Sequence, residues 1–389
     1  MKLLRLGLTL LLCCAFIHGG FAVGFAQEPE FDFDADAALL MEVHSGEIIW
    51  EMNSREQLYP ASLTKIMSLL LALEKLEQNQ VSLQDEVLIS ARAAAMGGSE
   101  LFLSEGDVVT LENLLIGMAV GSANDAAVAV AEHVGGSVEG FVEMMNAKAR
   151  ELGMTGSHFC NPHGLHDPDH YSTAYDIMLM SLALLEYPRI HQWATIWLDE
   201  HFLQGKIRSG EVYLSNTNRM VRTYQGCDGL KTGYSREAGN GISVTAQRGQ
   251  TRFLAIVLGA PTVDERYEAA EALLDYGFAS YKSVPVVEKG KVLAEVFVDK
   301  GQPSQVAAIT AKKLAVLLPR GAEEDFELEM KLAPCSPPLR KGQKLGELVA
   351  KFSENKEAAV DLIAAEAVAR ASQPALFLRL LDRWLQFGR

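Results

Sequence analysis

The most constraining feature of this sequence is an apolar segment from Ser62 to Leu76 that opens with a serine and a lysine three residues apart. Apolar residues occupy nearly every face of the helix expected there, which is typical of a helix buried inside a domain. Ser62 and Lys65 then lie on one face, at the N-terminal end, where free N–H groups and the helix dipole favour negative charge. An amine with a lowered pKa can take the proton of a serine hydroxyl, so this pair is a candidate nucleophile and base.

Two further motifs follow in order, Ser122-Ala123-Asn124 and Lys231-Thr232-Gly233. The sequence Ser-x-x-Lys, Ser-x-Asn, Lys-Thr-Gly is the signature of penicillin-binding proteins and class A β-lactamases. A second Ser-x-x-Lys, from Ser353 to Lys356, lies in a polar stretch with no partner motifs after it and indicates a solvated turn. The order of all three motifs, rather than the first alone, therefore points to an enzyme.

The second motif falls between two expected helices, Leu111–Val120 and Asp125–Val134, so its side chains belong to a short link that can face a cleft. The alternative for Ser122 and Asn124 is helix capping, since asparagine is a favoured N-cap residue. Taken alone, the second motif would favour capping.

The third motif lies on a predicted strand. Short apolar or alternating runs separated by Gly-rich and polar turns predict a meander that forms one sheet with an N-terminal hairpin. Lys231, Thr232 and Gly233 then lie on a strand at the sheet edge, where the backbone can pair with an extended peptide. The hairpin strands are Ala37–Val43 and Glu47–Met52, the meander strands are Gly229–Tyr234, Gly241–Gln247 and Phe253–Leu258, and a helix over Glu265–Tyr276 closes the domain.

The segment His163–His170 holds three histidines and two aspartates, which raises the possibility of a metal site. Pro, Gly and Asp dominate it as they do in turns, and it runs into Thr173, a suitable cap for a following helix. We therefore expect a structural loop and no metal.

The N-terminus resembles a secretory signal over residues 1–26, with Lys2 and Arg5 before an apolar run and small residues before the expected cleavage after Ala26. An uncleaved membrane anchor is the alternative, although the apolar run is short for a bilayer span. Removing two basic and no acidic residues moves the formal net charge from −15 to −17, which makes nucleic acid an improbable partner. The three remaining cysteines do not describe a disulfide scaffold.

Two segments follow the first domain, which we expect over 34–277. Short alternating runs and Pro-rich breaks over 283–371 predict a small β-rich domain without catalytic motifs. Residues 374–389 place their apolar side chains, Trp384 among them, on one arc of a helix and their charged side chains on the other. This segregation favours a helix lying in a membrane interface, the alternative being a terminal helix packed on its own protein.

Taken together, the sequence resembles the D-alanyl-D-alanine carboxypeptidases, the low-molecular-mass penicillin-binding proteins. The resemblance runs from about Asp34 to the C-terminus and rests on four motifs. The family implies an α/β catalytic domain with helices around an antiparallel sheet, a β-rich second domain and an amphipathic anchor on the outer face of the cytoplasmic membrane. The motifs are Pro60–Met67, Ser122–Ala126, Asn161–Leu165 and Asp228–Tyr234.

By this resemblance Ser62 attacks the peptide bond between the last two D-alanines of a peptidoglycan stem peptide, with Lys65 as its base. Ser122 relays a proton to the leaving amine and Asn124 binds the substrate amide. The remaining implied contacts are Lys231 and Thr232 on the terminal carboxylate, Gly233 as a substrate-binding position that permits close approach, and an oxyanion hole of the Ser62 and Tyr234 N–H groups.

The implied partners are stem peptides ending in D-Ala-D-Ala, β-lactam antibiotics and a membrane surface, with no cofactor. A second cation, Lys231, near Lys65 would lower the pKa of the base. Three alternatives remain open. They are a DD-endopeptidase, a serine β-lactamase, and a non-catalytic penicillin sensor.

Overall fold

The computed structural model describes residues 29, 31–352 and 356–379. The chain divides into an N-terminal unit, Met1–Asp32, and a second unit, Phe33–Arg389. All the described helices and strands lie in the second unit, and we call Ala37–Ser280 the first region and Tyr281–Arg370 the second region. The predicted signal over 1–26 lies outside the described residues.

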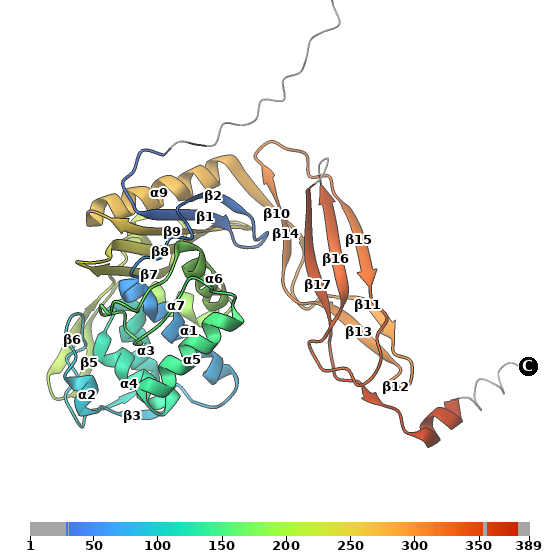
Figure 1. Cartoon of the computed structure of the whole chain (residues 1–389), viewed down its shortest axis with the longest axis horizontal. Coiled ribbons are helices and arrows are strands. Elements are labelled where there is room, and N and C mark those ends of the chain that lie inside the picture. Colours follow the sequence, from blue (N-terminus) through green and yellow to red (C-terminus); the bar gives the residue numbers. More distant parts are fainter. Residues whose placement is uncertain (1–28, 30, 353–355, 380–389) are drawn as a thin grey trace, which may run out of the picture. The chain divides into compact units, whose positions relative to one another are not determined.

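The first region is built around one antiparallel sheet of five strands in the order β2-β1-β9-β8-β7. The N-terminal hairpin and the later meander share this sheet, as the sequence predicts, and β7 with the Lys-Thr-Gly motif lies at its edge (Figure 1). The strands are β1 Ala37–Glu42, β2 Ile48–Met52, β7 Cys227–Ser235, β8 Gly239–Arg248 and β9 Thr251–Ala260.

Helices cover both faces of this sheet (Figure 1). The long helix α9, Val263–Ser280, packs on β1, β8 and β9 from one side. Helix α6, Ala174–Leu185, contacts the same three strands from the opposite side, where the remaining helices also lie. Those remaining helices are α1 Lys65–Glu77, α2 Ala91–Ala94, α3 Leu111–Val120, α4 Asn124–Gly135, α5 Val138–Glu151, α7 Arg189–Ala194 and α8 Met220–Thr223.

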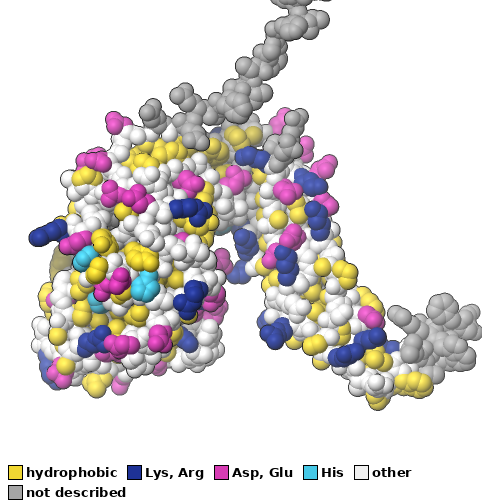
Figure 2. All heavy atoms as spheres, viewed as in Figure 1, with side chains coloured by type: hydrophobic (Ala, Val, Ile, Leu, Met, Phe, Trp, Pro, Cys, Tyr) yellow, Lys and Arg dark blue, Asp and Glu magenta, His cyan; other side chains and the backbone are white. Residues whose placement is uncertain are grey.

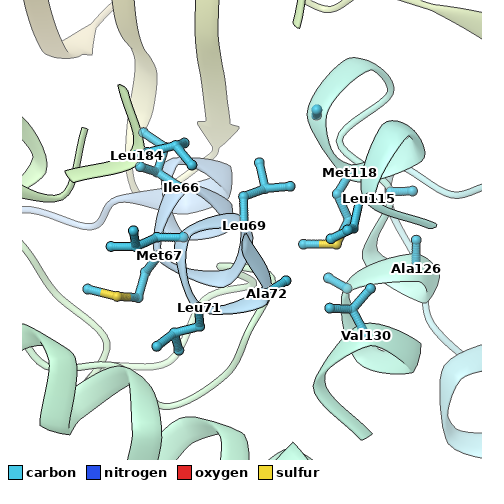
Figure 3. Close-up of a cluster of buried hydrophobic side chains, with 14 of the residues drawn as sticks. Ile66, Met67, Leu69, Leu71, Ala72, Leu115, Met118, Ala126, Val130 and Leu184 are labelled. Atoms are coloured by element: carbon cyan, nitrogen blue, oxygen red, sulfur yellow. The ribbon is translucent and has the colours of Figure 1, made fainter. Parts of the chain in front are cut away.

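Helix α1 is the central element of the first region. Every residue from Lys65 to Leu73 is buried, which confirms a helix that is covered on all sides. Figure 3 shows its apolar side chains between Leu184 of α6 on one side and Met118 of α3 with Val130 of α4 on the other. Burying each such side chain contributes roughly 1.5–3 kcal/mol, so the neighbours of α1 fix its position and with it the position of Ser62.

Two small pairs of strands in the first region were not predicted from the sequence. One pair is β3, Glu86–Leu88, with β4, Val108–Thr110, and the other is β5, Leu198–Ile207, with β6, Gly210–Ser215. Strands of three residues are too short to show alternation. In β5 most side chains are exposed and polar, so no apolar period marks it.

The second region is β-rich, as predicted. Its main sheet is antiparallel in the order β11-β13-β17-β16-β15, and two further pairs are β10 with β14 and β12 with β18. Its core is apolar and includes Val306 and Leu362. The strands are β10 Tyr281–Val287, β11 Val292–Phe297, β12 Gly301–Gln302, β13 Gln305–Thr310, β14 Leu314–Pro319, β15 Glu327–Leu332, β16 Lys344–Phe352, β17 Lys356–Ala364 and β18 Ala369–Arg370.

The predicted C-terminal helix is described only in part. Residues 373–379 are helical, with Phe377 and Leu378 exposed, and residues 380–389 lie outside the described residues. Within the described part of the chain, no helix is both long and apolar enough to cross a membrane. The turn predicted at Ser353 also falls outside the described residues. The amphipathic helix over 374–389 therefore stays a prediction.

Candidate active site

Ser62 lies in a single 3-10 turn, η1 Ala61–Thr64, that leads directly into α1. Ala61 enters this turn with a φ of 45°, an unusual backbone for a residue with a side chain. Ser62 is half-buried, and its Oγ lies 3.1 Å from the Nζ of Lys65. The predicted pairing of serine and lysine across one helical turn is therefore present.

The Lys65 side chain is fully buried and has two more hydrogen-bond partners. Its Nζ donates to Oδ1 of Asn124 at 2.7 Å and to the backbone carbonyl of His163 at 2.8 Å. No carboxylate forms an ion pair with it among the described residues. These neutral oxygens hold the amine in place without fixing a proton on it, as a carboxylate would.

Asn124 serves the site and not the end of the helix. Helix α4 begins at Asn124, its N-cap residue is Ala123, and no side chain caps it. The Asn124 amide instead donates to the carbonyl of Gly97 at 2.7 Å while its oxygen accepts from Lys65. The capping alternative for Asn124 is therefore wrong.

Ser122 has a buried hydroxyl without a hydrogen-bond partner among the described residues. Its φ of 62° is again unusual for a residue other than glycine. An unsatisfied buried hydroxyl costs about 1–3 kcal/mol, and strained residues of this kind cluster at functional sites. The second motif thus supplies an orienting amide and a hydroxyl that is free to bond a ligand.

The third motif brings a second buried lysine to the sheet edge. The Nζ of Lys231 donates to the carbonyl of Thr232 at 3.1 Å, and the Thr232 hydroxyl donates to that of Thr217 at 2.8 Å. Gly233 allows β7 to approach the serine turn, because an added Cβ would lie 3.2 Å from the Ser62 backbone nitrogen. Side chains larger than glycine would therefore push β7 away from Ser62.

Burial lowers the pKa of both lysines. The pKa of Lys65 falls well below its usual value, first because burial disfavours the charged form and then because Lys231 repels the charge, with Asp125 opposing this. Burial, followed by the charge of Arg266, lowers the pKa of Lys231 to about 7. The expectation that Lys231 depresses the pKa of Lys65 is confirmed, and desolvation is the larger cause.

Comparison with known proteins identifies the family of both regions. Residues 23–262 match the family model for D-alanyl-D-alanine carboxypeptidase, and residues 281–370 match that for the C-terminal domain of penicillin-binding protein 5. The chain belongs to the D-alanyl-D-alanine carboxypeptidase family. The prediction of a serine peptidase with a β-rich second domain is thus confirmed at the level of the family.

Individual relatives are similar over most of the chain. The D-alanyl-D-alanine carboxypeptidase DacF of Bacillus subtilis is 37% identical over 92% of both chains. The crystal structure of penicillin binding protein 5 from Haemophilus influenzae is 29% identical, with a TM-score of 0.70, over 88% of this chain and 99% of that one. Penicillin-binding protein D2 from Listeria monocytogenes, in its ampicillin-bound form, is 30% identical with a TM-score of 0.55, over 64% of this chain and 99% of that one.

Sequence reasoning named the motif Asn161–Leu165 but not its role. The loop that follows α5 carries this motif and contacts the Lys65 amine through the His163 carbonyl. Asn161 shapes the loop by accepting from the Gly164 N–H at 2.7 Å and donating to the Leu165 carbonyl at 2.9 Å. Gly164 then passes so close to the serine turn that an added Cβ would lie 1.8 Å from the Ala61 carbonyl oxygen. The signal was the motif Asn161–Leu165, but a contact made by a main-chain carbonyl leaves no trace in side-chain chemistry.

The same loop contains the histidines that suggested a metal. Within the residues the structure describes, no three His, Cys, Asp or Glu side chains gather as a metal site would require. His170 is instead buried, accepting from the Cys160 N–H through Nδ1 and bonding Thr64 through Nε2 at 2.8 Å. Burial lowers its pKa to about 4, so it is neutral at pH 7. His170 thus joins two parts of the loop to the serine turn.

Asp125 is a second buried group that the motif analysis passed over. Its carboxylate accepts from the backbone N–H groups of Leu101 and Leu103. These bonds hold the loop over residues 97–103, which also supplies the Gly97 carbonyl that orients Asn124. Burial raises the pKa of Asp125, and the backbone donors oppose that rise. Asp125 thus holds the loop that orients Asn124.

Proposed function

We propose that this enzyme removes the C-terminal D-alanine from peptidoglycan stem peptides ending in D-Ala-D-Ala, through an acyl-enzyme on Ser62. The observation that carries the proposal is the buried Lys65 amine, 3.1 Å from Ser62 Oγ and without a carboxylate partner among the described residues. A neutral lysine keeps two N–H donors, for Asn124 and His163, and turns its lone pair to the Ser62 hydroxyl. Lys65 then accepts the serine proton as Ser62 attacks.

The first half of the reaction forms the ester. Ser62 Oγ adds to the carbonyl of the penultimate D-alanine, and the oxyanion is held by the N–H groups of Ser62 and Tyr234, a contribution of about 3 kcal/mol per donor. Collapse breaks the C–N bond, and the proton held by Lys65 reaches the leaving amine through the Ser122 hydroxyl. The Ser122 hydroxyl has no hydrogen-bond partner within the described part of the chain, which supports this relay.

Substrate binding uses the polar groups on either side of Ser62. Asn124 bonds the amide of the acyl segment, Lys231 and Thr232 bind the terminal carboxylate, and Gly233 lets the substrate approach the strand closely. A hydroxyl and a cation together suit a carboxylate, because charge-assisted bonds are the stronger ones. Water then hydrolyses the ester with Lys65 again taking the proton, and these steps call on no cofactor.

The same chemistry predicts acylation by β-lactams, whose reactive amide mimics the scissile bond. The ampicillin-bound form of the Listeria relative supports this expectation. Endopeptidase action on cross-links needs the same groups and is the alternative closest to the proposal. A serine β-lactamase or a penicillin sensor is disfavoured, because the second region matches the C-terminal domain of a penicillin-binding protein and the nucleophile keeps every partner.

The proposed location is the outer face of the cytoplasmic membrane. Family membership supports action outside the cytoplasm, where peptidoglycan lies. We propose that 1–26 is a signal, that 34–277 and 283–371 are the two domains, and that 374–389 is a peripheral anchor. The anchor is tested by deleting 374–389 and measuring how the protein divides between membrane and soluble fractions. We expect the shortened protein to move from the membrane fraction to the soluble fraction.

The activity is tested by release of D-alanine from diacetyl-L-Lys-D-Ala-D-Ala by the wild-type enzyme and by Ser62→Ala. We expect release by the wild type, and from the variant neither release nor capture of labelled penicillin. A wild type that captures penicillin but releases no D-alanine would move the function to an endopeptidase or a sensor.

A further inference from the structure

Strand β15, Glu327–Leu332, ends the main sheet of the second region (Figure 1). Among the described strands only β16 pairs with it, and that pairing runs over six residues without a shift of register. The other side of β15 therefore presents backbone donors and acceptors that no described strand uses. Such an open edge is a template for a further strand.

Three residues of β15 direct their backbone groups to this open side. The Ala333 N–H, which directly follows the strand, donates to the Leu345 carbonyl in β16 at 2.8 Å. In an antiparallel strand, successive residues direct their backbone groups to opposite neighbours. Counting back from Ala333, the residues that face the open side are Leu328, Met330 and Leu332.

The side chains of the same three residues form an apolar strip that the protein leaves uncovered. Leu328 lies opposite Ala350 of β16, and Met330 lies opposite Leu348, both of which belong to the apolar core. Because opposite residues share a face of a sheet, β15 continues the face that covers the core. Leu328, Met330 and Leu332 are nevertheless 54%, 44% and 40% exposed. Apolar side chains at an open edge mark a surface that another chain can cover.

The opposite edge of the sheet, strand β11, is built differently. Its register with β13 shifts between Val292 and Ala294. An irregularity of this kind disrupts the regular pairing that a further strand would need. Glu295 is the one charged residue of β11, so a second copy of β11 offers it no cation. Of the two edges, β15 is the one that suits pairing with another strand.

The charges of β15 favour a second copy of the same strand as the partner. Two antiparallel copies centred on Met330 place Glu329 of each copy opposite Lys331 of the other. The same register places Leu328 opposite Leu332, which joins the two apolar strips. Opposite charges and apolar pairs facing each other across two strands both stabilise a sheet.

Other registers lack this complementarity. Centring the two copies on Glu329 or on Lys331 places like charges opposite each other, and centring them on Leu328 places Glu327 opposite Glu329. Like charges in such positions are destabilising. The sequence of β15 therefore selects the register centred on Met330.

Both charged side chains can take part in this pairing. The side chains of Glu329 and Lys331 are 44% and 52% exposed, and their N···O distance within one strand is 3.8 Å, which is long for an ion pair. Glu329 also contacts Lys351 of β16 at 2.5 Å. A carboxylate accepts several donors, so Glu329 can bind a lysine of a second copy in addition.

We propose that β15 is a dimerisation strand, through which two copies of this chain join antiparallel at Met330 and form one continuous sheet about a two-fold axis. A two-fold axis brings the same surface of both copies together, as a self-complementary strand requires. One pair of strands is a small interface, so we expect a weak dimer with a dissociation constant on the order of 10 µM. The contact uses no residue of the active site, and the inference does not rest on the proposed function.

Cysteine cross-linking of the full chain in mild detergent tests the register. In Met330→Cys the two new thiols lie opposite each other, with Cα atoms about 5.5 Å apart, a distance that a disulfide can bridge. Leu328→Cys is the matched control, because it is exposed on the same face but lies opposite Leu332 and not its own counterpart. Under mild oxidation we expect a linked dimer to form about tenfold faster in Met330→Cys than in Leu328→Cys or the wild type.

Two charge reversals test the complementarity. Glu329→Lys and Lys331→Glu each place like charges opposite each other in a dimer of the variant, and each should weaken the dimer about tenfold in sedimentation. In an equimolar mixture every lysine again lies opposite a glutamate of the other chain. The mixture should therefore regain the dissociation constant of the wild type, which also shows that both variants are folded.

A wild type that sediments as a monomer well above the expected dissociation constant would overturn the proposal. So would a Met330→Cys variant that links no faster than Leu328→Cys, or a mixture of the two charge reversals that stays as weak as either variant alone.

Discussion

The two regions differ in what they bury. In the first region the interior holds ionisable side chains, among them Lys65, Lys231 and Asp125. In the described part of the second region the buried polar residues are Ser283 and Thr310, and neither is ionisable. Figure 2 shows both regions with charged surfaces, so the contrast concerns the interior alone.

Buried charge also differs within the first region. Arg252 and Asp228 form a two-pronged ion pair with both N···O distances at 2.8 Å, which satisfies both charges. Lys65 and Lys231 have no such partner among the described residues. Burying an unpaired charge is costly, so the protein retains these lysines at the expense of stability. The paired Arg252 and Asp228 therefore serve the fold, whereas the unpaired Lys65 and Lys231 serve the chemistry of the site.

The largest expected effect comes from Lys65→Met, which replaces the buried amine with an apolar chain of similar length. We expect the rate of acylation by penicillin to fall about 10³-fold, because removing a general base costs roughly 10²–10⁴-fold. Stability should change little, because the cost of burying the amine is removed while the oxygens of Asn124 and His163 lose a donor. Stopped-flow acylation and denaturant unfolding measure the two quantities. A variant that acylates at the wild-type rate would exclude Lys65 as the base.

The second prediction concerns the apolar interior of the second region. Leu362 is fully buried there, and Leu362→Ala should lower the free energy of unfolding of this region by about 3 kcal/mol through a cavity. The value of kcat/KM for a short soluble peptide should stay at the wild-type level under folding conditions. Denaturant unfolding and D-alanine release are measured on the same variant. A loss of activity under conditions in which the variant is folded would show that the second region contributes to the chemistry.

The smallest expected effect is a pH dependence of stability. The pKa of Lys231 is about 7 when folded and near 10.5 when unfolded, so between these values the unfolded chain binds more protons. Stability therefore rises with pH across that window, by at most about 1.4 kcal/mol per pH unit for one lysine. Lys231→Met should flatten this rise in denaturant unfolding at pH 7, 8 and 9. Equal slopes in the two proteins would contradict the lowered pKa.

Local patterns were enough to predict the elements that hold the site. The apolar run after Ser62 predicted α1, and alternation between turns predicted the sheet with Lys231 at its edge. These features are visible because helix burial and strand pairing impose a period on the sequence. The spacing of Ser62 and Lys65 then places the two side chains on one turn.

The remainder of the site depends on contacts between distant segments. The His163 carbonyl bonds Lys65 across nearly a hundred residues, and Asp125 bonds backbone N–H groups of another loop. The positive φ of Ala61 and Ser122 is likewise set by what surrounds them. Main-chain partners and backbone strain carry no residue-type signature, so sequence alone could not supply them.

The most direct test of the central claim is to locate the covalent adduct. Wild-type enzyme is treated with penicillin, digested, and the modified peptide is sequenced by mass spectrometry, with Ser62→Ala and Lys65→Met in parallel. We expect one adduct on Ser62, formed slowly in Lys65→Met and absent in Ser62→Ala. An adduct on any other residue, or undiminished acylation of Lys65→Met, would contradict the assignment of the chemistry to this buried pair.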